Sequence, residues 1–213
     1  MTDLSYDCTW DTVIVLDDWL GPNKYECQIY FDIETDNGDE QNTAFERCKI
    51  LLETVFDHGV FININNPLMS TLQKKTKQKI ITLPTEPLDV IVAAVIYSKL
   101  NAISEGRLSI QKVKIRSKQG DNIWVHFDED FATDFGSLSC DFYDSLKDET
   151  PWWSRSDPST GDWFETNKKE LKFHKQTSTW DKSLNWQQEP SNDKKSKSSW
   201  KPQVIDGGKE TKH

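Results

Sequence analysis

The sequence has none of the usual marks of an exported or membrane protein. Its four cysteines lie far apart without a Cys-x-x-Cys pair, and it contains no Asn-x-Ser/Thr acceptor for glycosylation. The longest apolar run, residues 90–97, is much shorter than the roughly 20 residues that a membrane-spanning helix needs. The first residues form neither a basic region nor an apolar run, so we expect no signal peptide. These absences predict a soluble cytoplasmic protein with reduced thiols and no membrane partner.

Apolar residues are also scarce and unevenly distributed. Only 35% of the 213 residues are hydrophobic, against roughly 45–50% in an average globular chain. Residues 1–150 contain 26 acidic and 14 basic residues, whereas residues 151–213 have a net charge of +3 and six of the nine tryptophans. A polar segment with so few aliphatic residues cannot offset the entropy lost on ordering. We predict an α+β domain at 1–128, an acidic connector at 129–150 and a disordered tail, rich in Trp, Lys and Ser, at 151–213.

Hydrophobic periodicity predicts the elements of the folded domain. Short apolar or alternating runs predict strands, and apolar residues three and four positions apart predict helices. Between residues 25 and 116 the predicted order is β-α-β-β-α-β, which is typical of a two-layer ferredoxin-like (split β-α-β) sheet with two helices, here with additional edge strands. The predicted strands are 12–16, 25–33, 60–64, 79–83, 108–116 and 122–127, and the predicted helices are 44–58 and 88–103.

Two details of this pattern are specific. The inward-facing positions of strand 108–116 change phase in mid-strand, which predicts a β-bulge near Gln111. The second helix is apolar almost all round, so we expect it to lie between the first helix and the sheet. Ile96 should then be a core residue, and Lys99 should reach solvent on the short polar side.

The segment Tyr30–Thr35 (YFDIET) contains two acids at the end of a predicted strand. It resembles the first motif of the DEDD-type 3′–5′ exonucleases. The resemblance implies that Asp32 and Glu34 bind two Mg²⁺ ions for phosphodiester hydrolysis, and alternate strand residues do point to the same side. The later acidic motifs of these enzymes have no good match, because Asp89 begins a helix and other acids lie in or beyond the connector. A solvated strand face explains the same acids without catalysis.

Other ligand patterns are incomplete. Asp32, Glu34 and Asp36 match the first ligand positions of an EF-hand loop, but the glycine comes one residue late and Thr43 occupies the last position. No histidine lies at zinc-ligand spacing from a cysteine. No glycine-rich phosphate loop, serine nucleophile motif or Cys/His pair is visible. We predict no catalytic residue, metal or cofactor, with Asp32, Glu34 and Mg²⁺ as the alternative.

Nucleic-acid binding has only partial support in the sequence. Val60–Asn65 resembles half of an RNA-recognition signature, in which strand aromatics stack on bases, but its second half is missing. The net charge of −12 on residues 1–150 opposes contact with phosphates. The basic segments 74–79 and 107–118 could meet nucleic acid or an acidic partner, or form ordinary charged surface. Nucleic acid is therefore the less favoured partner.

Aromatic residues recur in the polar C-terminal segment. Exposed tryptophans are costly without a use, and Trp is the residue most enriched at interface hot spots. Docking on the domain's own open sheet face is the alternative to partner binding. The predicted partner-binding residues are Trp152, Trp153, Trp163, Phe164, Trp180, Trp186 and Trp200.

A longer block, from Leu83–Asp89 through Lys99–Leu108 and the hairpin that follows, is similar to small uncharacterised proteins of tailed, T4-type marine phages. The resemblance implies a viral accessory or assembly protein, located in the host cytoplasm or on the virion, and it implies no activity. The sequence therefore predicts a non-enzymatic interaction or accessory protein whose domain and tail bind a protein partner. The alternative is a Mg²⁺-dependent exonuclease of the DEDD type.

Overall fold

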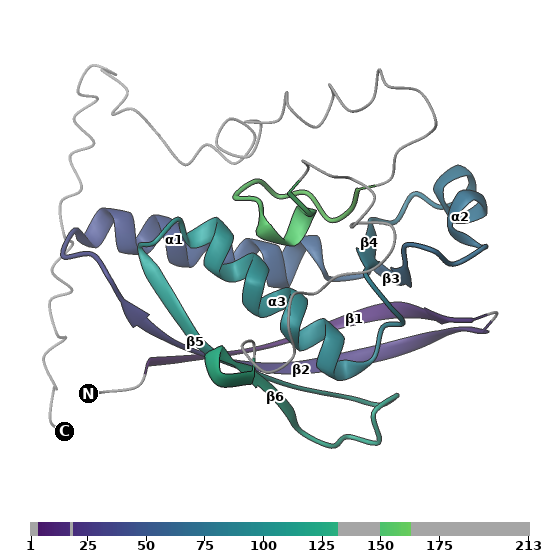
Figure 1. The fold of residues 1–213 in the computed structure, drawn as a ribbon, viewed down its shortest axis with the longest axis horizontal. Helices are drawn as coiled ribbons and strands as arrows, with labels where there is room; N and C mark the ends of the chain where they lie inside the picture. Colours follow the sequence, from purple (N-terminus) through teal and green to yellow (C-terminus); the bar gives the residue numbers. More distant parts are fainter. Residues whose placement is uncertain (1–3, 18, 132–149, 163–213) are drawn as a thin grey trace, which may run out of the picture.

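The computed structural model describes residues 4–17, 19–131 and 150–162 (Figure 1). It confirms an α+β domain with helices and strands close to the predicted positions. The region expected to be a loop, 65–78, contains a short helix, α2. The strands are β1 (Leu4–Leu16), β2 (Trp19–Ile33), β3 (Val60–Asn63), β4 (Ile80–Leu83), β5 (Leu108–Ser117) and β6 (Val125–Asp128). The helices are α1 (Gly38–Ile50) with its π-helical continuation η1 (Leu51–Val55), α2 (Met69–Lys75), α3 (Asp89–Ser104) and the single 3₁₀ turn η2 (Trp152–Ser154).

The strands form one mixed sheet in the order β4-β3-β1-β2-β5-β6. β1 and β2 form a long antiparallel hairpin, in which Leu4 lies opposite Phe31 and Leu16 lies opposite Trp19. β3 is parallel to β1 and β4 is parallel to β3, whereas β5 and β6 continue the sheet antiparallel on the other side. The long hairpin is therefore the centre of the sheet. Among the described residues, no helix is both long and apolar enough to cross a membrane.

The ferredoxin-like arrangement is not confirmed. A split β-α-β unit requires that the two strands joined by a helix run in the same direction, with another strand between them. α1 joins β2 to β3, and these run in opposite directions because the intervening β1 is antiparallel to β2 and parallel to β3. β1, of which the sequence predicts only the last residues, occupies the central position. The order of elements alone did not determine where this strand inserts.

α1 and α3 cover one face of the sheet (Figure 1). Alternate residues of β2, such as Cys27 and Ile29, are buried beneath the helices, and the residues between them face the other side. Ile96 of α3 is fully buried, which confirms the predicted core position. Tyr30 pairs with Lys112 and Phe31 pairs with Ile110, so Gln111 is the extra residue of the predicted bulge.

Residues 150–162 pack on the domain, although the sequence analysis assigned them to the end of the connector and to a disordered tail. Trp152 is 0% exposed, and its indole N–H donates a hydrogen bond of 2.8 Å to the carbonyl oxygen of Thr82. The N–H of Thr82 donates to the carbonyl oxygen of Thr160 at 2.9 Å, so the segment also covers the outer edge of β4. The domain therefore includes residues 150–162. The rest of the predicted tail, 163–213, and connector residues 132–149 lie outside the described residues.

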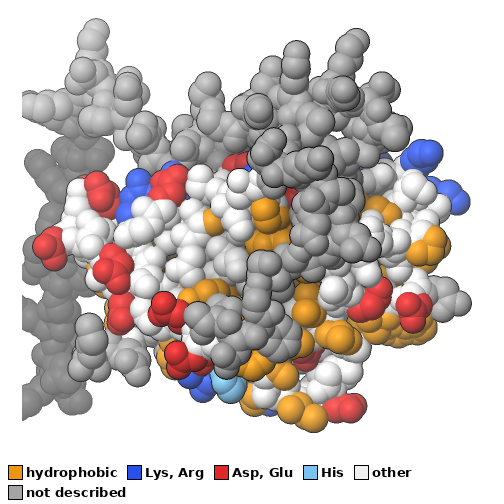
Figure 2. Space-filling model, in the orientation of Figure 1, with side chains coloured by type: hydrophobic (Ala, Val, Ile, Leu, Met, Phe, Trp, Pro, Cys, Tyr) orange, Lys and Arg blue, Asp and Glu red, His pale blue; other side chains and the backbone are white. Residues whose placement is uncertain are grey.

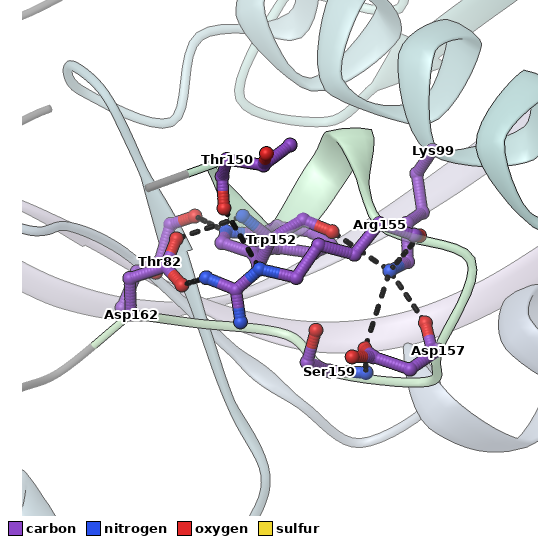
Figure 3. Close-up of polar contacts among 8 residues, drawn as sticks. All are labelled: Thr82, Lys99, Thr150, Trp152, Arg155, Asp157, Ser159 and Asp162. Carbon is purple, nitrogen blue, oxygen red and sulfur yellow. Dashed lines mark hydrogen bonds and ion pairs between the residues drawn. The ribbon is translucent and has the colours of Figure 1, made fainter. Parts of the chain in front are cut away.

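The expectation that Lys99 reaches solvent is wrong. Its side chain is 0% exposed, because residues 150–162 cover the end of the polar stripe of α3. The ammonium donates to the carbonyl oxygens of Trp152 (2.8 Å), Arg155 (2.9 Å) and Asp157 (2.6 Å), as Figure 3 shows. These backbone acceptors replace water, so the buried charge keeps its hydrogen bonds.

Candidate interaction site

The face of the sheet opposite α1 and α3 contains a groove over β2, β5 and β6. Polar and charged residues of these strands alternate with core residues and therefore gather on this face. We call the depression the sheet groove. It has a volume of about 550 Å³, and a smaller hollow of about 320 Å³ adjoins it at Lys114, beside Trp124 and His126. The walls of the sheet groove include Tyr30, Asp32, Lys112, Lys114, Asp128 and Glu129.

Cations hold two aromatic side chains of this face in place. The ammonium nitrogen of Lys114 lies 4.9 Å from the centre of the Tyr30 ring. The guanidinium of Arg116 lies 4.7 Å from the Trp124 ring and donates hydrogen bonds of 3.0 and 2.6 Å to Oε2 of Glu26. Each cation–π contact contributes about 0.5–1 kcal/mol at such a surface site. The contacts order these side chains before a partner arrives, which lowers the entropy lost on binding.

The sheet groove also contains an ion pair between Lys112 and Asp128. Lys112 lies 3.3 Å from the carboxylate of Asp128, and the N–H of Phe131 donates to Asp128 at 3.1 Å. Desolvation raises the pKa of Asp128, but these two contacts outweigh it and hold the pKa below its usual value. Asp128 is therefore ionised at neutral pH. The sheet groove presents fixed charges of both signs beside the aromatic rings.

The two acids of the exonuclease-like segment, Asp32 and Glu34, lie in different surroundings. Asp32 lines the sheet groove, whereas Glu34 lies beyond the end of β2 and is exposed, with its N–H bound to the carbonyl oxygen of Arg107 at 3.0 Å. Within residues 4–17, 19–131 and 150–162, no group of three or more His, Cys, Asp or Glu side chains could hold a metal ion. Asp32 and Glu34 therefore belong to no such group among the described residues.

The remaining predicted residues have different surroundings. Phe61, from the RNA-like segment, is buried against Tyr25 and Phe56, so its ring has no access to a base. Trp152 and Trp153 are buried in the core, so they dock on the domain, but Trp152 packs against Phe56 and Lys99 on the helix side and not on the open sheet face of the self-docking alternative. The other predicted partner-binding residues, Trp163, Phe164, Trp180, Trp186 and Trp200, lie outside the described residues.

Sequence reasoning identified the basic residues of this face but missed their aromatic partners. Lys114 and Arg116 belong to the predicted basic segment 107–118, whereas Tyr30 and Trp124 were not singled out. One signal was available, because the alternation of β2 puts Tyr30 on the polar face. The register that brings β5 next to β2 could not be derived from the sequence.

Exposed apolar side chains lie at the ends of both hairpins. Trp19 and Leu20 at the end of the β1–β2 hairpin are 51% and 50% exposed, and Ile123 and Trp124 before β6 are 64% and 40% exposed. Figure 2 shows hydrophobic side chains gathered at both of these places. Trp124 therefore connects the sheet groove to an apolar rim.

Comparisons with known proteins identify no family. No family model matches the chain, and no curated protein matches it. Among solved structures, the chain is similar to an uncharacterised protein from Wolinella succinogenes. The two are 11% identical with a TM-score of 0.43, over 60% of this chain and 98% of the other.

Proposed function

We propose that this chain is a non-enzymatic interaction or accessory protein that binds a protein partner through the sheet groove and the smaller hollow that adjoins it at Trp124. The observation that supports the proposal is the pair of aromatic side chains, Tyr30 and Trp124, held by Lys114 and Arg116 on one face. Tyr, Trp and Arg are the residues most enriched at the energetic centres of protein interfaces. The adjacent apolar rim at Ile123 adds surface that a partner can remove from water.

The charge of the sheet groove favours a protein over a nucleic acid. Asp32, Asp128, Glu129 and Asp130 line it together with Lys112 and Lys114, so acids outnumber bases. Such a surface repels phosphates but suits a polypeptide with charges of both signs. A viral accessory role agrees with the resemblance of residues 83–108 to phage proteins. The tryptophans of residues 163–213 would provide a second contact, as the sequence predicts.

Affinity capture from the native host cell tests the proposal. The baits are the full chain, Lys114→Glu, Trp124→Ala and the control Lys74→Glu, which reverses an exposed lysine on α2 outside the sheet groove. We expect one protein to be captured by the full chain and the control, and to be lost with both groove variants. Calorimetric titration of that purified protein should then show binding weakened about tenfold or more by Trp124→Ala.

Two outcomes would contradict this function. If the groove variants bound the partner as tightly as the full chain does, the sheet groove would not be the interface. Mg²⁺-dependent degradation of single-stranded DNA by the full chain, abolished by Asp32→Ala in a folded variant, would establish the exonuclease alternative. Circular dichroism and thermal melting of each variant show that it is folded before either result is interpreted.

A further inference from the structure

The first half of β1 is an open edge of the sheet, and we propose that it binds an extended basic segment of a partner protein as an additional β-strand. β2 pairs with β1 along its whole length, but β3 pairs only with Val13–Val15. Figure 1 shows that β1 continues well beyond the short β3. We call residues 4–9 the open edge.

The backbone groups of Ser5, Asp7 and Thr9 point towards this open side. The direction follows from later odd-numbered residues, because Val13 donates to the carbonyl oxygen of Gly59 at 3.0 Å and Asp11 accepts from His58 at 2.7 Å, both away from β2. Backbone groups alternate between the two sides of a strand. In the part of the chain that the structure describes, no N–H or C=O group of Ser5, Asp7 or Thr9 has a hydrogen-bond partner.

Contacts on the helix side of the sheet hold the open edge in place. The Tyr6 hydroxyl donates to the carboxylate of Glu53, and the Tyr6 ring meets the Phe45 ring edge-on, with centroids 5.2 Å apart. Cys8 and Trp10 are buried in the core. An ordered ladder of this kind loses little entropy when a strand is added, and main-chain hydrogen bonds then provide the affinity.

Charge determines which strand the open edge favours. Asp7 and Asp11 are exposed, and Asp57 lies at the same side, where it accepts from the N–H of Asp11 at 3.1 Å. Lysine or arginine at alternate positions of an added strand would lie next to these acids, and opposite charges across strands are stabilising. A second copy of the chain, paired antiparallel, would instead bring the Asp7 and Asp11 side chains of both copies onto one short ladder. A different, basic chain is therefore the favoured occupant.

This surface differs from the one in the proposed function. Both involve a protein partner, but the open edge belongs to β1, on the other side of β2 from β5 and β6, and no residue that lines the sheet groove belongs to β1. A variant such as Trp124→Ala leaves the open edge unchanged, and Asp7→Lys leaves the sheet groove unchanged. The failure of one proposal is therefore distinguishable from the failure of the other.

A short acetylated peptide of alternating lysine and valine is the probe. In ¹⁵N NMR spectra of the full chain, we expect it to protect the amide protons of Ser5, Asp7 and Thr9 from solvent exchange. The same peptide N-methylated at every residue keeps its charge but loses the donors of both edges, and it should not bind. Asp7→Lys should weaken binding about fivefold, whereas Asp36→Lys, an exposed acid outside the open edge, should not.

Thr9→Pro provides a test that leaves the charge unchanged. It removes an outward N–H at an edge position and keeps the hydrogen bonds to β2, so a folded variant should lose peptide binding. Equal binding of the N-methylated peptide, or protection of amides elsewhere, would overturn the proposal. It would also be overturned if the edge amides were already protected in the chain alone. If that protection were lost on dilution, the occupant of the open edge would be a second copy of the chain. If it were lost on removal of residues 163–213, the occupant would be a segment of the same chain.

Discussion

The ammonium nitrogen of Lys99 lies 2.8 Å from the carbonyl oxygen of Trp152, and this hydrogen bond connects α3 to a residue 53 positions later in the chain. The segment that follows Trp152 curls around the ammonium. The side chains of Arg155 and Asp162 form an ion pair, and Asp162 also accepts from the backbone N–H of Trp152 at 2.8 Å (Figure 3). Lys99 therefore holds residues 152–157, and the Arg155–Asp162 ion pair and the bonds of Thr160 to β4 hold the rest of the segment.

Replacing Lys99 by Met should destabilise the domain. Methionine has a similar volume, so the main loss is that of the hydrogen bonds to buried carbonyl oxygens. Each buried carbonyl oxygen left without its donor costs about 1–3 kcal/mol, and removing the lysine also removes the cost of burying its charge, so we expect a net loss of about 2–4 kcal/mol. Urea denaturation measures it, and Lys74→Met at the surface of α2 is the control. Equal midpoints for the two variants would show that Lys99 does not hold the segment.

The stability that depends on Lys99 should increase with pH. Burial lowers the pKa of Lys99 from its ordinary 10.5 to about 7, because desolvation outweighs the attraction of the Asp157 carboxylate. Between these values the unfolded chain binds more protons than the folded chain, so unfolding becomes less favourable as pH rises, by at most about 1.4 kcal/mol per pH unit. This contribution is complete above the unfolded pKa and is lost as pH falls through about 7.

The corresponding measurement compares the free energies of unfolding of the wild type and Lys99→Met at a series of pH values. Taking the difference cancels the titration of every other group. We expect the wild type to gain on the variant between pH 7 and about 8.5. A difference that stays constant, or that shrinks over this range, would mean that Lys99 keeps its proton in the folded state.

Ser117 should stabilise the buried carboxylate of Asp89 at the start of α3. Its hydroxyl donates to Asp89 Oδ1 at 2.7 Å, and burial raises the pKa of Asp89 although this hydrogen bond lowers it. Ser117→Ala should cost about 1–3 kcal/mol at pH 7, because it leaves the buried carboxylate without this donor. Because the folded pKa lies above the unfolded one, the stability linked to Asp89 is present at low pH and is lost as pH rises. Since the Ser117 hydrogen bond lowers the pKa, it favours the charged form, and the cost of the mutation should be smaller near pH 4.

The control for this variant is Ser109→Ala on the same strand, since the Ser109 hydroxyl accepts a hydrogen bond from the Gln111 side chain at the exposed surface. Urea denaturation of both variants at the two pH values gives the comparison. A Ser117→Ala cost that does not differ between the two pH values would contradict a role for the charged carboxylate.

Local patterns predicted the parts of this fold that depend on neighbouring residues. The alternation of residues 25–33 and the phase change at Gln111 are properties of single strands, and both are found in β2 and β5. The sheet order depends on which long strand pairs with which. β1 pairs with both β2 and β3, and no local pattern encodes that choice.

The candidate site could likewise be predicted from the sequence only in part. Lys114 is visible in the sequence as part of a basic segment, but its contact with Tyr30 spans 84 residues. The exposure of Lys99 was predicted wrongly for a related reason. The helix has a polar stripe there, and what covers that stripe is a Trp-containing segment whose composition resembles the disordered tail around it. Whether such a side chain lies in the core or at the surface depends on the residues that pack against it, and the residue type alone does not show this.

Two truncations should separate the docked segment from the residues that follow it. Ending the chain after residue 162 retains the contacts that Trp152 makes within the described residues. Ending it after residue 149 removes a fully buried tryptophan from the core and leaves Lys99 without its carbonyl acceptors. Deleting a buried Trp side chain costs about 3–5 kcal/mol, comparable to the ~2–5 kcal/mol expected for Ile96→Ala. We expect the first truncation to keep the urea midpoint of the full chain, and the second to lower it at least as much as Ile96→Ala does. Trp152→Ala in the full chain should reproduce most of that loss, and Trp124→Ala, at a partly exposed site, should not. If the chain ending at 149 were as stable as the one ending at 162, residues 150–162 would not belong to the domain.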